Sequence, residues 1–460
     1  MKRTFLKFLP IAAAILLATS CSKDNDGDNS VAPAPVETQN IASPTESSPT
    51  ESKSVPFSIK VVGGGSLSKV AYADDGSTVT TKFEESDKDN VVLRVTDTYV
   101  TIDLTLAEVD AKGVATFEGD WGENPEPAEG TVMDAYFYYN GESTVTTSTT
   151  SLPDLMKSCA HLYTGTFKYK TDDKVMLTDN NAYIEIIMSP LQHDIDLTIG
   201  GTPQNFAMAN GKVWIAVANG TTFTTNFTAE KTCTAGRITT INRAGFVDLG
   251  ISGGILWADK NLGATNVYDY GNYYAWGEVD PKNDYSWDSY SYGRAKVEGE
   301  SHAMVNKYCP TDKADYWYGD GSPDGITTLE ASDDAATFAN TKWKMPESSD
   351  FAALKSNCNW VWVTDYNSSV CGYVVYKKKS GDSPSYSVAD DTHIFLPAAG
   401  FHLGTPLSSD GTNGHYWSSS LRTDGPDFGF ALYFISDFVN PGGSINYRNY
   451  GFSVRPVRCK

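Results

Sequence analysis

The chain has 460 residues, a length that accommodates two or three domains with hydrophobic cores. It carries 57 Asp and Glu against 36 Lys and Arg, so the formal charge is −21. Phosphate groups are bound through basic patches, which this excess of acidic residues disfavours. Nucleic acid and direct binding to anionic membrane surfaces are therefore excluded as expected partners.

The first twenty residues are predicted to be a lipoprotein signal peptide. A basic start, MKRTFLK, precedes the apolar run FLPIAAAILLA, which is too short to span a bilayer. The following LATSC resembles a lipobox, in which the signal is cut before the cysteine and the thiol is acylated. SKDNDGD, directly after Cys21, resembles the acidic surface-export signal of Bacteroidetes lipoproteins. These resemblances imply lipidation of Cys21, for example with palmitate, and display at the surface of the outer membrane; an ordinary signal peptide with a chance cysteine is the alternative.

Residues 21–55 are predicted to be a disordered tether. They repeat Pro, Thr, Glu and Ser in SPTESSPTES and contain few apolar side chains, so they cannot bury enough surface to offset their ordering entropy. From residue 56 to about residue 243, short alternating or β-branched runs are bounded by Gly, Asn and Asp, which predicts a β-sandwich. Within this part only LPDLMKSCAHLY has a helical pattern.

The β-rich part also resembles a known family. SLSKVAYADDGSTVTTKFEESD, LTLAEVDAKGVATFEGDW and AGRITTINRA, in this order, resemble the fimbrillin-like adhesin domains of Bacteroidetes. The resemblance implies a fimbrillin-like sandwich over residues 56–243 and pilus subunits as partners. Stalk pilins of that group are cut after an Arg, whereas no Arg lies between Cys21 and Arg94. We therefore expect an anchor, a tip or a free-standing surface protein instead of a polymerising stalk subunit.

Residues 244–460 change in composition and are dense in Tyr, Trp, Gly, Ser and Asn. FVDLGISGGILWADKNLGA, DYGNYYAWGEVDPKNDYSWDSYSY, GHYWSSSLRTDGPDFGFALYF and YGFSVRPVRC, in this order, resemble the Fibrobacter succinogenes major paralogous domain. The resemblance implies a C-type-lectin-like fold in which the last strand pairs with the first, so that GFSVRPVR would lie against FVDLG. The expected fold class is mainly β, with a β-sandwich followed by an α+β C-terminal domain.

Local patterns predict short helices and a buried C-terminus in this last part. Ser332 is placed to cap a helix over SDDAATFAN, and Pro346 suits the start of a helix in which Phe351 and Leu354 share one face. In the final segment Phe452 and Val454 alternate with Ser453 and Arg455, as in a strand, and Pro456 requires an edge or a bend. A terminus this apolar is normally tied into a core.

Catalytic motifs are missing from the sequence. It contains no nucleophile elbow, P-loop, H-E-x-x-H or dinucleotide fingerprint. Formylglycine-generating enzymes, which are related in fold to the lectin-like domain, need two reactive cysteines near the domain end, where this chain has only Cys459. Besides Cys21, which the lipid would occupy, the chain has six cysteines, Cys459 among them. They are widely spaced, match no zinc pattern and leave any disulfide pairing open. We predict a non-enzyme; a glycan-processing or glycan-capture accessory enzyme is one alternative, because paired carboxylates cannot be recognised from spacing, and a passive structural protein is another.

One acidic stretch, YGDGSPDGITTLEASDD, could supply oxygen ligands for calcium. Its spacing is not that of an EF-hand, and Asp-Gly pairs are also ordinary turns. The candidate ligands are Asp320, Asp324, Glu330, Asp333 and Asp334. No other cofactor is expected.

The last strands carry the mixture of Tyr, Arg and Asn that binding surfaces use. The candidate ligand-binding residues are Tyr416, Arg422, Asn446, Tyr447, Arg448 and Asn449. Surface display is expected above all for Tyr447, Arg448 and Asn449. The predicted function is non-catalytic binding of a protein or glycan ligand by this C-terminal head, with a role as a pilus tip or anchor component.

Overall fold

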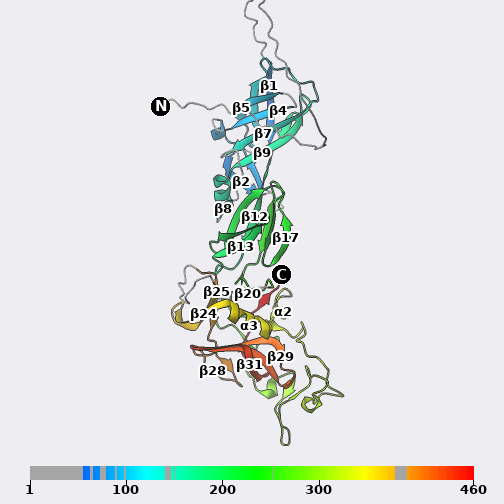
Figure 1. The fold of residues 1–460 in the computed structure, drawn as a ribbon, viewed down its shortest axis with the longest axis vertical. Helices are drawn as coiled ribbons and strands as arrows, with labels where there is room; N and C mark the ends of the chain where they lie inside the picture. Colours follow the sequence, from blue (N-terminus) through cyan, green and yellow to red (C-terminus); the bar gives the residue numbers. More distant parts are fainter. Residues whose placement is uncertain are drawn as a thin grey trace, which may run out of the picture. The chain divides into compact units, whose positions relative to one another are not determined.

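The computed structural model describes residues 55–62, 66–72, 79–88, 91–97, 100–139, 147–149, 151–251, 253–378 and 391–459 (Figure 1). Strands dominate these residues, as the sequence predicts, and helices are few and short. The predicted signal peptide, Cys21 and the tether up to residue 54 lie outside the described residues. No helix in the described part of the chain has the length and apolar character to cross a membrane.

Eight N-terminal strands form one sheet that closes on itself. In sheet order they are β10 (Lys174–Met176), β1 (Pro56–Val62), β6 (Ala115–Asp120), β5 (Thr101–Val109), β4 (Val92–Thr96), β7 (Val132–Tyr139), β9 (His161–Lys168) and β11 (Thr178–Asp179). Strand β10 pairs with β1, and β11, which follows it directly, pairs with β9, so one stretch of chain joins both edges. Phe117 and Trp121 lie in the core that the sheet encloses. A separate hairpin of β2 (Ser66–Tyr72) and β3 (Val79–Lys82) precedes the 3-10 turn Glu85–Asp87.

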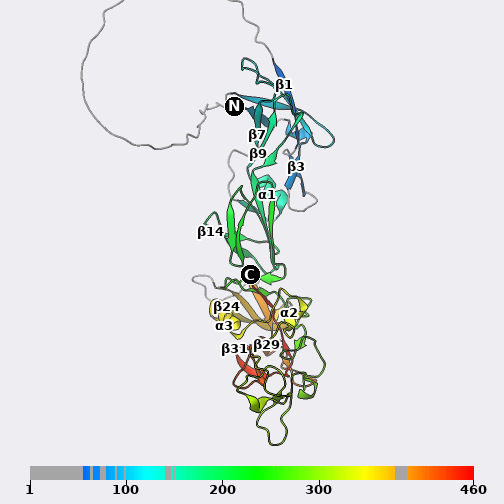
Figure 2. The ribbon, with the colours of Figure 1, turned by 90° about the vertical axis from the view of Figure 1, so that its right-hand side faces the viewer.

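The next strands form a β-sandwich of two four-stranded sheets (Figure 2). One sheet contains β18 (Ile238–Asn242), β12 (Asn181–Ile187), β15 (Lys212–Ala218) and β8 (Thr147–Thr149), and the other contains β14 (Thr202–Ala207), β13 (Asp194–Ile199), β16 (Thr222–Thr225) and β17 (Thr228–Thr232). Their inner faces share a core that includes Ile184, Leu197 and Ile215. Helix α1 (Leu152–Ser158), which the sequence predicts, packs Leu155 against Trp214 on the outer face of the first sheet.

The sequence predicts a single sandwich over residues 56–243, whereas the structure divides these residues between two hydrophobic cores. Alternation of apolar side chains identifies strands, but it does not identify their partners. The predicted domain boundaries before residue 56 and after residue 243 stay predictions.

The described residues between 246 and 458 form five small sheets and two helices, α2 (Ala335–Ala339) and α3 (Ser348–Asn357). The largest sheet has the order β21 (Tyr273–Tyr274), β32 (Phe452–Ser453), β29 (Gly414–Leu421), β30 (Phe428–Ile435) and β31 (Phe438–Tyr447). A second sheet has the order β19 (Phe246–Val247), β20 (Leu256–Ala258) and β33 (Val457–Arg458). A third has the order β24 (Cys358–Tyr366), β25 (Val370–Lys377) and β26 (His393–Pro397). Short pairs are β22 (Gly293–Arg294) with β23 (Met304–Val305) and β27 (Phe401–His402) with β28 (Leu407–Ser408), and 3-10 turns span Trp287–Ser289 and Ala314–Tyr316. Helix α3 packs against the largest sheet (Figure 1).

The C-terminal segment is buried, as predicted, but its partner is different. Strand β33 pairs with β20, and FVDLG contributes β19 to the opposite edge of β20. The preceding strand β32 belongs to the largest sheet, where it pairs with β21 and β29. The segment breaks between β32 and β33 at Pro456, which has no N–H to donate to a ladder. The prediction that GFSVRPVR lies directly against FVDLG is therefore wrong, although its last two residues, Val457–Arg458, share a sheet with Phe246–Val247.

The helix predictions hold in position and need one correction in capping. Phe351 and Leu354 are fully buried on one face of α3, as predicted. Helix α2 is capped by Asp334, whose carboxylate accepts from the amides of Ala336 and Thr337 at 2.9 and 3.0 Å, and not by Ser332. The same carboxylate accepts from the Met345 amide at 2.9 Å, which a serine at position 332 could not reach.

The buried terminus makes a stability prediction. The Phe452 ring is fully buried and stacks on Trp417 with centroids 4.3 Å apart, so Phe452→Ala should lower the free energy of unfolding by about 3–5 kcal/mol. Phe438→Ala is the matched control, because that ring is 51% exposed, and it should cost less than about 1 kcal/mol. Urea unfolding of both variants measures the difference, and equal losses would show that the terminus does not support the core.

His415 makes a second prediction because its imidazole is buried among aromatic rings. The rings of Phe401, Tyr433 and Phe452 lie 4.8, 4.9 and 4.8 Å from it, and neither ring nitrogen has a hydrogen-bond partner in the described structure. Burial lowers the pKa of His415 to about 4. Because the folded-state pKa is depressed, the folded protein holds His415 in its neutral form. The stability that depends on this neutral form is complete above the ordinary pKa of about 6.5 and is lost as the pH falls toward 4.

We therefore expect the free energy of unfolding to fall by about 2 kcal/mol as the pH decreases from about 7 to about 5, because unfolding allows His415 to take up a proton. His415→Phe keeps a ring of similar size and should remove this share of the acid sensitivity. Urea titrations of the wild type and the variant across this range measure it. Parallel pH profiles for the two proteins would contradict the assignment.

Candidate functional site

The predicted ligand-binding residues do not form one surface. Tyr416 is fully buried and donates to the Pro397 carbonyl at 2.7 Å, and Asn449 is buried and donates to the Tyr285 carbonyl at 2.7 Å. Arg448 is also fully buried. The expectation of surface display is therefore wrong for Arg448 and Asn449. Strand β31 ends at Tyr447 and a turn follows, so the strand alternation that the sequence suggests stops before Arg448.

Three of the predicted residues reach solvent in part. Arg422 pairs with Asp424, with Nε and Oδ1 2.8 Å apart, and Asn446 donates to the Ser444 hydroxyl at 3.0 Å. The ring of Tyr447 stacks on Phe428, with centroids 4.3 Å apart. Their polar groups and rings thus serve local packing on the hairpin that they belong to.

The Arg448 guanidinium organises the loops around it instead of facing a ligand. It donates to the Tyr290 hydroxyl at 2.9 Å, the Pro426 carbonyl at 2.9 Å and the Lys307 carbonyl at 3.1 Å. The ring of Trp276 lies 5.2 Å from the guanidinium carbon, a cation–π distance. These contacts tie the loops before α2 to the largest sheet.

Four of the five candidate calcium ligands have another role. Asp324 accepts from the amides of Tyr308 and Cys309 at 2.8 and 2.9 Å, and Asp334 caps α2. Asp333 and Glu330 both lie 2.7 Å from the Lys307 ammonium, and Asp320 is exposed. No group of three or more His, Cys, Asp or Glu in the described residues is placed to hold a metal ion. The structure therefore does not bring the five carboxylates together.

A buried cluster that the sequence did not suggest combines Cys159, His161 and Asp179. His161 Nδ1 lies 2.7 Å from Asp179, and Nε2 lies 2.8 Å from the Met156 carbonyl and 3.2 Å from the Cys159 thiol. Burial opposes the imidazolium, but the hydrogen bonds and charges of Asp179 and Cys159 together outweigh burial and raise the pKa of His161 to about 10. A protonated ring donates from both nitrogens, to Asp179 on one side and to the Met156 carbonyl on the other, so the cluster joins β9, β11 and the end of α1.

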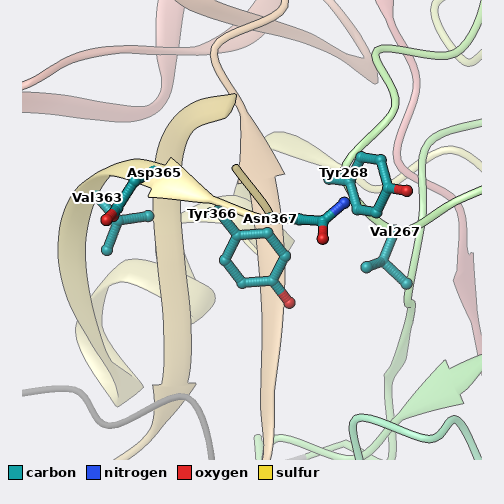
Figure 3. A pocket seen from close by; sticks show the side chains of 6 residues that line it. All are labelled: Val267, Tyr268, Val363, Asp365, Tyr366 and Asn367. Carbon is teal, nitrogen blue, oxygen red and sulfur yellow. The ribbon is translucent and has the colours of Figure 1, made fainter. Parts of the chain in front are cut away.

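A pocket of about 380 Å³ lies beside the β24–β25 hairpin (Figure 3). Its lining consists of Val267, Tyr268, Val363, Asp365, Tyr366 and Asn367. Figure 3 shows the Asn367 amide reaching toward the Tyr268 ring, with the Tyr366 ring close by. Asp365 and Asn367 are exposed, and no hydrogen bond or ion pair within the described residues engages their side chains. The pocket thus combines two aromatic rings with a carboxylate and an amide that are available to a ligand.

Hydrogen bonds stabilise the loop wall of the pocket, and ring stacking stabilises the strand wall. On the loop side, Asp269 accepts from the Asn266 amide at 2.7 Å, and Asn261 donates to the Tyr270 carbonyl at 2.8 Å. On the strand side, the Tyr366 ring stacks on Phe395 with centroids 3.9 Å apart and an interplanar angle of 4°. The two tyrosine rings therefore belong to pre-organised segments.

The Tyr366 hydroxyl is directed inward by His393. Burial lowers the pKa of His393 to about 4, so its imidazole is neutral at physiological pH. Its Nδ1 lies 2.8 Å from the Asp391 carbonyl and donates to it, which leaves Nε2 to accept from the Tyr366 hydroxyl at 3.1 Å. Burial also raises the pKa of Tyr366 to about 12. Tyr366 therefore lines the pocket as a largely buried ring, and its hydroxyl is not ionised.

The hairpin turn that carries the polar groups is strained. Asn367, Ser368 and Ser369 have φ values of 44°, 72° and 137°, although none of them is glycine. Such conformations cost about 1–3 kcal/mol each and cluster at functional sites. The sequence contained one signal for this turn, the run DYNSS between two β-branched segments, but it could not show that Tyr268 lies opposite.

Comparisons with known proteins give no family. No family model matches the chain, and no curated protein matches it. A fimbrial assembly protein from Parabacteroides distasonis aligns with 12% identity over 41% of this chain and 90% of that chain, with a TM-score of 0.21. A major pilin from Streptococcus pyogenes aligns with 10% identity over 42% of this chain and 98% of that chain, with a TM-score of 0.14. TM-scores this low carry no argument, so both family resemblances stay predictions.

The reassignment of Arg448 makes a prediction. Arg448→Ala should lower the free energy of unfolding by at least about 3 kcal/mol, because it leaves several buried carbonyls without donors. Arg422→Ala removes a partly exposed guanidinium of the same chemistry and should leave the urea midpoint nearly unchanged. If Arg448→Ala folds with wild-type stability, the guanidinium does not organise these loops.

Proposed function

We propose that this chain is a non-catalytic, surface-displayed protein that captures a saccharide in the pocket between Tyr268 and Tyr366. The observation that carries the proposal is the pocket lining, which brings together two tyrosine side chains, an exposed carboxylate and an exposed amide. Aromatic faces pack on the C–H faces of sugar rings, and carboxylate and amide groups bind their hydroxyls in directed pairs. A volume of about 380 Å³ lies in the range of small-molecule sites.

Binding is favoured over hydrolysis by the number of acidic groups. Glycoside hydrolysis uses two carboxyl groups on either side of the scissile bond, one to donate a proton and one to act as nucleophile or base. Asp365 is the single carboxylate in the lining of this pocket. A glycan-processing enzyme remains the second reading, and release of product from a bound glycan distinguishes it.

The cellular setting of the proposal comes from the sequence. LATSC followed by SKDNDGD supports a lipid anchor at Cys21, and the Ser-rich and Pro-rich tether would present the folded part to the outside. The finer proposal is that the fimbrillin-like part and the lectin-like head act within a pilus, as a tip or anchor component. A passive structural role, with no ligand, is the third reading.

We expect Tyr268→Ala and Asp365→Asn to weaken glycan binding at least about tenfold each, as anchor residues of an interface do. Their melting temperatures should change little, since both side chains are at least partly exposed and Asp365 has no hydrogen-bond or ion-pair partner among the described residues. A glycan array with the purified full chain identifies the glycan, and calorimetry then measures both variants.

Tyr318→Ala and Asp437→Asn are matched controls, because they make the same changes at exposed positions outside the pocket lining. Wild-type affinity in both pocket variants would move the site elsewhere. Absence of any glycan ligand would favour the passive structural reading, and hydrolysis of a bound glycan would favour the enzymatic one.

A further inference from the structure

A basic cavity lies where the end of the sandwich meets the C-terminal strand. Its volume is about 480 Å³, and its lining includes Arg243, Lys342, Lys344 and Arg458. A neighbouring cavity of about 500 Å³ shares Arg243 and adds Lys231. No Asp or Glu lines either cavity. Because the whole chain carries 57 acidic against 36 basic residues, this concentration of one sign is unlike its average surface.

The positive charges of the cavity are largely uncompensated. Within the described residues, Lys344 is the one member of the four with a carboxylate in reach, Glu347 at 3.6 Å, and Asp350 also acts on it. Arg243 Nε is buried without a hydrogen-bond partner, and its guanidinium lies 5.9 Å from the Phe227 ring. Burial and the neighbouring charge of Arg458 lower the pKa of Arg243. An anion between the two guanidinium groups would relieve their repulsion and satisfy the free donor.

We propose that this cavity binds an acidic saccharide through its carboxylate or sulfate groups. Arginine presents a fork of donors that matches both oxyanions, and Lys342 and Lys344 add point charges at the rim. Thr341 and the partly exposed Trp343 ring line the same space and suit hydroxyls and a sugar face. Arg243 also lines the neighbouring cavity, where Lys231 adds a further cation. This site shares no residue with the tyrosine pocket and takes a ligand of different charge.

Calorimetry on the full chain with defined probes tests the proposal. Trigalacturonate supplies carboxylates, a chondroitin sulfate tetrasaccharide adds sulfate, and maltotriose is a neutral sugar of comparable size. Binding of either acidic probe, at least tenfold tighter than maltotriose and weakened by added salt, is the expected result, and comparison of the two separates the carboxylate source from the sulfate source. Equal binding of maltotriose would overturn the proposal.

Charge-removing variants locate the site. Arg458→Gln and Lys342→Gln should each weaken binding of the better acidic probe at least threefold, and Lys112→Gln, an exposed lysine of the first sheet region, should leave it unchanged. Because Lys342 is exposed, Lys342→Gln should not affect folding. It therefore tests the proposal even if the arginine variant fails to fold. Wild-type affinity in folded variants of both cavity residues would overturn the assignment.

Cys459 supplies an independent readout, because its exposed thiol lines the cavity. The bound saccharide should slow alkylation of Cys459 by iodoacetamide at least threefold, while the rate at Cys371, a partly exposed thiol outside the cavity, should not change. Mass spectrometry of the two peptides gives both rates. Unaltered alkylation of Cys459 at saturating probe, or equally tight binding of inorganic sulfate or a short DNA duplex, would overturn the saccharide assignment.

Discussion

The buried guanidinium of Arg455 is the interaction on which the C-terminal part depends. An arginine cannot lose its proton in a protein, so each buried N–H must meet an acceptor. Arg455 meets Asn261 Oδ1 at 2.9 Å, the Ala258 carbonyl at 3.0 Å and the Phe395 carbonyl at 2.6 Å. These acceptors belong to β20, the loop after it and β26, so one side chain near residue 460 joins segments that lie about 60 and 195 residues earlier in the chain.

Arg455 donates hydrogen bonds to residues that support both walls of the tyrosine pocket. On one side, Asn261 accepts from Arg455 and donates to the Tyr270 carbonyl, which positions the loop that carries Tyr268. On the other side, Arg455 holds the backbone of Phe395, whose ring stacks on Tyr366. A ligand that fits between the rings therefore does not have to order them, which reduces the entropy cost of binding.

The sequence predicted what depends on local spacing. Alternation identified the strands, and the helical spacing of Phe351 and Leu354 identified the buried face of α3. Long-range partners were beyond it: the apolar end segment was correctly predicted to be buried, yet its neighbour is β20 and not FVDLG. The sequence predicted that residues 446–449 would be displayed at the surface, because the alternation of side chains does not show where a strand ends. Arg448 follows the end of β31, and its burial comes from loops far away in sequence.

The basic cavity illustrates the same limit for electrostatics. Its cations come from separate segments, so no run of Lys and Arg announces it, and the net charge of −21 alone argues against anionic ligands. At physiological ionic strength, charges act over a Debye length of about 8 Å. A ligand group inside the cavity therefore responds to Arg243 and Arg458 far more than to distant carboxylates. The acidic surface repels an anionic ligand mainly while the ligand approaches the protein, and this repulsion is greater for a long polyanion than for a short one. Short acidic saccharides would therefore match the proposed site better than long polyanions.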